Sequence, residues 1–79
     1  MGPRLAAVIW WHDAPDGREL KIVLDGYEWL VLVEGDERAF RGRDLCHTVA
    51  EAVGGESTAP WTVALADQVE AAASRSLSR

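Results

Sequence analysis

The 79-residue sequence contains a single cysteine, Cys46, and therefore cannot form an intramolecular disulfide bond. Small secreted domains usually depend on a disulfide framework, so this composition predicts a reducing, cytoplasmic environment. No apolar run approaches the ~20 residues that are needed to span a bilayer, which argues against a membrane protein. Basic residues are also few: 8 Lys and Arg stand against 13 Asp and Glu, and the formal charge is −5. Such a chain repels phosphate backbones on average, which argues against nucleic acid as a partner.

Residue types that carry chemistry are scarce and scattered. Cys46 and His47 are adjacent on a predicted helix, where neighbours lie about 100° apart, so they do not converge on one metal ion. A structural zinc site also needs four ligands. His12 and Asp13 could form a base and the group that orients it, but no nucleophile lies on an ordered element to accompany them. We therefore predict that the protein is not an enzyme and holds no metal or cofactor, and no small-molecule substrate is identifiable.

The sequence is rich in turn signals between short apolar runs. The first, within residues 13–18, fits a type I turn with a G1 bulge, which pairs Trp10 with Ile22. The second, Asp25-Gly26, fits a two-residue type I′ turn, which pairs Ile22 with Trp29. These signals predict two consecutive β-hairpins.

A third turn within residues 34–37 pairs Val31 with Phe40. All three registers place the same apolar residues on one face of the sheet, and a slip of one residue in any hairpin would break that agreement. The sequence thus predicts a four-stranded antiparallel meander. Its predicted core face comprises Val8, Trp10, Leu20, Ile22, Leu24, Tyr27, Trp29, Val31, Val33 and Phe40.

Two helices are expected after the meander. Asp44 can cap a helix that runs to Val53 and ends at Gly54-Gly55, and Pro60 suits the first turn of a second helix. We expect an α+β fold: a four-stranded antiparallel β-meander followed by two α-helices (ββββαα), with the helices packed on one sheet face. Residues 1–73 would form a single small domain, and residues 74–79 a disordered polar tail.

The second sheet face is expected to be unusually apolar in its centre. A solvent-facing sheet surface normally alternates to polar residues, whereas an apolar centre with a charged rim is typical of an interface. Two alternatives remain: the second helix could cover this face, or Trp11 could be an ordinary large surface residue. The preferred interpretation is a small non-enzymatic interaction domain, a homodimer or a domain that binds a partner protein. The predicted interface comprises Ile9, Trp11, Val23, Leu30 and Leu32.

The alternative function involves the one basic stretch, Arg38, Arg41 and Arg43 around Phe40. Basic residues interleaved with an aromatic residue can bind single-stranded nucleic acid. Residues 40–54, FRGRDLCHTVAEAVG, also resemble the strand-to-helix corner of HicB-like antitoxin domains. This alternative is a nucleic-acid-associated or antitoxin-like regulatory module, and no site residue follows from the resemblance.

Overall fold

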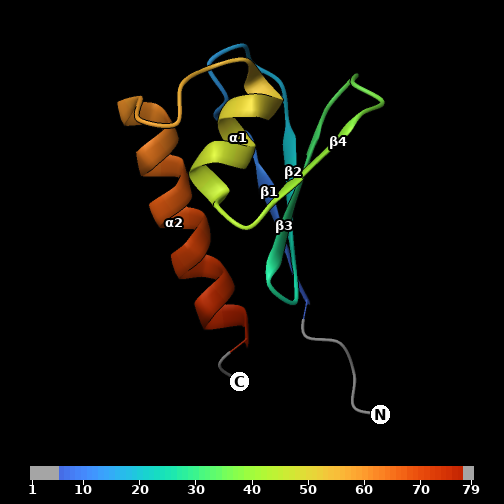
Figure 1. Ribbon diagram of the computed structural model, residues 1–79, viewed down its shortest axis with the longest axis vertical. Helices are drawn as coiled ribbons and strands as arrows, with labels where there is room; N and C mark the ends of the chain where they lie inside the picture. The colour runs from blue at the N-terminus through green and yellow to red at the C-terminus, as the bar shows by residue number, and fades with distance from the viewer. Residues whose placement is uncertain (1–5, 78–79) are drawn as a thin grey trace.

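A four-stranded antiparallel sheet is followed by two helices in the computed structural model, which describes residues 6–77. Strands β1 (Ala6–Trp11), β2 (Leu20–Asp25), β3 (Glu28–Val33) and β4 (Ala39–Gly42) are neighbours in that order. Helices α1 (Leu45–Val53) and α2 (Pro60–Leu77) lie on one side of the sheet (Figure 1). The expected ββββαα fold is confirmed.

The first hairpin differs from its predicted register by one residue. β1 pairs with β2 as Ile9↔Ile22 and Trp11↔Leu20, so Trp10 is not opposite Ile22. Because side chains alternate along a strand, this shift turns the whole of β1 over. Trp10 is therefore on the face away from the helices, and its predicted place in the core is wrong.

The turn between β1 and β2 has its predicted local geometry, so the shift does not arise there. Gly17 has φ 79° and donates its N–H to the carbonyl of Ala14 over 2.9 Å, as in a type I turn followed by a left-handed glycine. The predicted register continues this turn directly into the strands, whereas residues 12–19 belong to neither β1 nor β2. The pairing that begins at Trp11 and Leu20 differs by one residue from the pairing that the turn alone would give, and this offset decides which face of β1 is buried.

The other two hairpins keep their predicted faces. β2 and β3 are joined by Gly26-Tyr27, one residue later than expected, and Asp25 pairs with Glu28. Gly26 has φ 66° and no other residue of this turn has a positive φ, which is the pattern of a type II′ turn. The predicted type I′ turn would have required a positive φ at Asp25. The turn predicted Trp29 opposite Ile22, whereas Val31, two residues further along β3, lies there. A shift of two residues leaves the facing of β2 and β3 unchanged.

Tyr27 itself lies in this turn and is 89% exposed, so its predicted place on the core face is wrong. The third register is as predicted, with Val31 opposite Phe40 and Leu32 opposite Ala39.

Both helices cover the face of the sheet that carries Ile22, Trp29 and Val31. α1 packs on β3 and β4, and α2 packs on β1 and on α1. The alternative in which the second helix covers the opposite face is therefore excluded. The residues that are fully buried in this core are Leu20, Ile22, Leu45, Leu65, Val31, Val49, Val69, Thr48 and Thr62.

The helix ends follow the predicted chemistry. Asp44 is the N-cap of α1, and its carboxylate accepts a hydrogen bond from the His47 N–H over 3.4 Å. Gly54, at φ 72°, ends α1 in the left-handed conformation. α2 begins at Pro60 as expected but continues to Leu77, so residues 74–77 of the predicted disordered tail are helical; residues 78 and 79 lie outside the described range. Within residues 6–77, no helix has the length and apolar character to cross a membrane.

Candidate functional site

The face of the sheet away from the helices, called the open face below, is the most unusual surface of the described chain. Two cross-strand rows run through it, one from Val8 to Arg41 and the other from Trp10 to Ala39. Val8 and Trp10 are 52% and 53% exposed, respectively. The open face comprises Val8, Trp10, Lys21, Val23, Leu30, Leu32, Ala39 and Arg41.

Three of the five predicted interface residues belong to the open face, and two do not. Val23, Leu30 and Leu32 lie there, each partly buried by its neighbours. Ile9 and Trp11 instead pack against the core on the helix side, so their predicted placement is wrong. The cause is the one-residue offset between the first turn and the β1–β2 pairing.

Sequence reasoning missed Val8 and Trp10 as residues of this surface. Every residue of β1 is apolar, so its pattern contains no alternation that could assign a face. The first turn gives no signal either, because its left-handed Gly17 is as predicted and the register differs only beyond it, where Trp11 pairs with Leu20.

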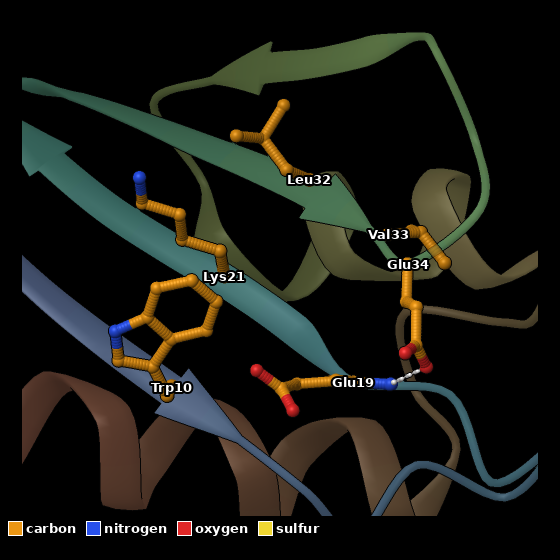
Figure 2. Close-up of a pocket in the computed structure, with 6 residues that line it drawn as sticks. All are labelled: Trp10, Glu19, Lys21, Leu32, Val33 and Glu34. Atoms are coloured by element: carbon orange, nitrogen blue, oxygen red, sulfur yellow. Dashed lines mark hydrogen bonds between the residues drawn. The ribbon is translucent and has the colours of Figure 1, made fainter.

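A hollow of about 260 Å³ adjoins Trp10 on the open face (Figure 2). Lys21 lies directly opposite Trp10 on the neighbouring strand, and its Nζ atom is 5.4 Å from the centroid of the indole ring. A cation at this distance from an indole is attracted by the negative face of the ring. The hollow is lined by Trp10, Glu19, Lys21, Leu32, Val33 and Glu34.

Charged side chains stand at the ends of the strands around this hollow. The N–H of Glu19 donates to Oε1 of Glu34 over 3.2 Å, and the N–H of Glu34 donates to the carbonyl of Glu19 over 2.9 Å. Oε2 of the Glu19 side chain lies 3.3 Å from His12 Nδ1. At the opposite end of the sheet, Arg41 Nη1 is 3.6 Å from Glu28 Oε1. The surface therefore has an apolar centre and a charged rim.

The residues considered for catalysis or metal binding are not assembled into a site. His47 Nε2 lies 3.9 Å from Glu51 Oε1 on the solvent side of α1. Burial, followed by the charges of Asp44, Glu70 and Asp67, raises the pKa of Cys46, which opposes a reactive thiolate. Among residues 6–77, no three His, Cys, Asp or Glu side chains are placed to share a metal ion.

The basic edge of the alternative function is largely neutralised by acids. Nη2 of Arg38 lies 3.0 Å from Oδ2 of Asp36, and the Arg38 guanidinium holds the pKa of the Asp36 carboxyl below its usual range. Arg41 is paired with Glu28, and Arg43 is exposed beyond the end of β4. The three arginines thus do not form a continuous positive surface.

No family model matches this chain, and neither a curated protein nor a solved structure shows significant similarity to it.

Proposed function

We propose that this protein is a small non-enzymatic interaction domain that binds a protein surface through its open face around Trp10. The observation that carries the proposal is the half-exposed indole of Trp10 beside the half-exposed Val8. Tryptophan is the residue type most enriched among interface hot spots. Its position within a face, rather than at a loop tip, gives it a flat apolar surrounding.

The distribution of charge supports the same proposal. The centre of the open face holds Val23, Leu30 and Leu32, where a wet sheet surface would carry polar residues. Charges stand at the ends of the strands, in pairs such as Glu28 with Arg41. Contiguous apolar patches with a polar rim mark interaction sites on soluble proteins.

Comparison of two exposed aromatic residues tests this proposal. Trp10 is on the open face, whereas Tyr27 is 89% exposed in the turn between β2 and β3 and provides a matched control. We expect Trp10→Glu to abolish co-purification of protein partners, and Tyr27→Glu to leave it unchanged. Circular dichroism must show that both variants are folded. Retention of the same partners by wild type and Trp10→Glu would contradict the proposal.

The nucleic-acid alternative is the weaker one because Asp36 and Glu28 pair with two of the three arginines. Fluorescence anisotropy with a labelled single-stranded oligonucleotide at low salt separates the two functions. We expect no binding, and salt-sensitive binding that Arg43→Gln weakens would favour the alternative.

A further inference from the structure

The two edges of the described sheet are protected to very different degrees. β4 has only four residues, contains Arg41 and is followed by Arg43, and short charged edge strands resist pairing with other chains. β1 has six residues, AAVIWW, with no charge and no proline. No strand within residues 6–77 pairs with its outer side. β1 therefore lacks the devices by which an edge strand avoids intermolecular pairing.

The register shows which backbone groups of β1 point outward. In a two-residue hairpin, the residues that flank the turn exchange both backbone hydrogen bonds, and bonding pairs alternate from there. Counting from the β2–β3 turn, Ile22 directs its N–H and C=O toward β1, where it pairs with Ile9. The next residues on either side, Val8 and Trp10, direct theirs away from the sheet. The outward backbone groups and the exposed large apolar side chains of the strands thus belong to the same two residues.

The flank of α2 that overlooks this edge carries no acid. At 100° per residue, Asp67 and Glu70 lie about 120° and about 180° around the helix from Trp61, away from this edge. Trp61 donates its indole N–H to the carbonyl of Asp13 just beyond β1, over 3.1 Å. The exposed positions nearest to Trp61 around the helix are Gln68, Arg75 and Ala64, so this flank carries a base and no acid.

We infer that the outer side of β1 pairs with the same strand of a second copy of this chain, antiparallel and about a two-fold axis. The inference deepens the proposed function and rests on it, because Trp10 belongs to both surfaces. With Ile9 opposite the partner's Ile9, Val8 lies opposite the partner's Trp10 and exchanges both backbone hydrogen bonds with it. The two sheets then form one continuous sheet with the helices of both copies on the same face.

The outer side of β1 is complementary to itself, which favours a second copy of this chain over an unrelated strand. In this register, each exposed indole lies beside an exposed valine of the other chain, an aromatic–β-branched pair that stabilises antiparallel strands. A chain of formal charge −5 repels its own copy, but β1 brings no charge to the axis. Dimerisation is a common source of stability for chains of this length.

The direct test is an isotope-filtered NOE experiment on a mixture of labelled and unlabelled wild-type protein. We expect an intermolecular contact between the Hα of Ile9 and the Hα of the partner's Ile9, because α-protons approach closely in non-hydrogen-bonded antiparallel pairs. Amide exchange at Val8 and Trp10 should slow as protein concentration rises. Exchange at Ile9, which is bonded to β2 in either state, should not depend on concentration.

Variants separate edge pairing from binding by the open face. Val8→Pro removes an outward N–H without disturbing the β1–β2 ladder, and Val8→Lys keeps that N–H but adds a charge to the edge. Each should weaken the dimer by about tenfold or more in sedimentation equilibrium, because every change occurs twice across the axis. Leu30→Glu, two strands away on the open face, should leave the dimer intact.

A strictly monomeric wild type at millimolar concentration overturns the edge inference, and the co-purification experiment with Trp10→Glu still decides the proposed function. A dimer that Leu30→Glu dissociates and both Val8 variants preserve also overturns it, because the contact is then face to face.

Discussion

Lys21 and Trp10 lie directly opposite each other on β2 and β1, with the Lys21 Nζ atom 5.4 Å from the centroid of the indole ring. The contact places a cation over the most exposed large aromatic ring of the open face. It also leaves the rest of that ring accessible, since Trp10 is 53% exposed. The interaction therefore orients Trp10, the side chain that contributes most to binding in the proposed function.

Removal of this cation should cost a small amount of stability. We expect Lys21→Ala to lower the free energy of unfolding by about 0.5–1 kcal/mol, the range for cation–π pairs at exposed sites. Lys21→Arg, which keeps a cation over the ring, is the control and should stay close to wild type. Urea denaturation followed by circular dichroism measures both values, and an equal loss in the two variants would show that the charge over Trp10 is immaterial.

The fold class and the facing of β2, β3 and β4 could be predicted from the sequence. The facing of β1 could not, because it depends on a shift of one residue in the first hairpin. β2 and β3 alternate around charged residues such as Lys21 and Glu28, so a register error of two residues left their faces correct. β1 has no such alternation, and its facing depended wholly on how the chain passes from the first turn into the paired strands. Val23, Leu30 and Leu32 were therefore predictable as surface residues.

The sequence patterns assigned Trp10 to the core and Trp11 to the second face, which is the reverse of the observed arrangement. Hydrophobicity cannot distinguish two adjacent tryptophans, and only the pairing of β1 with β2 separates them. The pairs between Lys21 and Trp10 and between Glu19 and His12 depend on that pairing too. Sequence patterns could not predict these two side-chain pairs.

Stability measurements should distinguish the two tryptophans. Trp11 is partly buried against the core, and we expect Trp11→Ala to cost about 2 kcal/mol or more, toward the range for truncated buried aromatic residues. Trp10→Ala, on the open face, should cost less than about 1 kcal/mol, because surface substitutions have small effects. Chemical denaturation of the two variants, with Trp29→Ala as a buried reference, checks the order. The reverse order would restore the originally predicted register.

Gly42 should be intolerant of a side chain. A Cβ atom at this position would lie 2.5 Å from Oγ1 of Thr48, which is buried and donates a hydrogen bond to the carbonyl of Asp44 over 2.8 Å. We expect Gly42→Ala to destabilise the protein by about 1–3 kcal/mol through overpacking between β4 and α1. In a Thr48→Ala background the same substitution should cost clearly less, and a double-mutant cycle by thermal unfolding measures the difference. Additive effects would mean that the two positions do not touch.

The thiol of Cys46 should react slowly at neutral pH. Burial raises its pKa first, and the charges of Asp44, Glu70 and Asp67 raise it further. Because the thiolate is the nucleophile, a raised pKa lowers the reactive fraction at any pH below it. The rate of iodoacetamide alkylation against pH should therefore have a midpoint above that of a cysteine in a short peptide. Glu70→Gln removes one of the negative charges and should move the midpoint down; an unchanged midpoint would show that the charge of Glu70 does not act on the thiol.

The pairing of Asp36 with Arg38 gives the last prediction, which concerns the basic edge. Hydrogen bonds from the Arg38 side chain lower the pKa of Asp36, so the folded state holds this proton less tightly than the unfolded state does. The pair therefore contributes stability above the unfolded pKa of this carboxyl, and the contribution is lost as pH falls through the folded value. The carboxyl ¹³C signal of Asp36 should titrate at a higher pH in Arg38→Gln than in wild type.

Asp36→Asn, in turn, frees Arg38 without removing it. If the edge formed by Arg38, Arg41 and Arg43 bound nucleic acid, this variant would bind an oligonucleotide more tightly than wild type at low salt. We expect neither protein to bind, because the arginines are dispersed between β4 and its flanking turns rather than gathered on one surface.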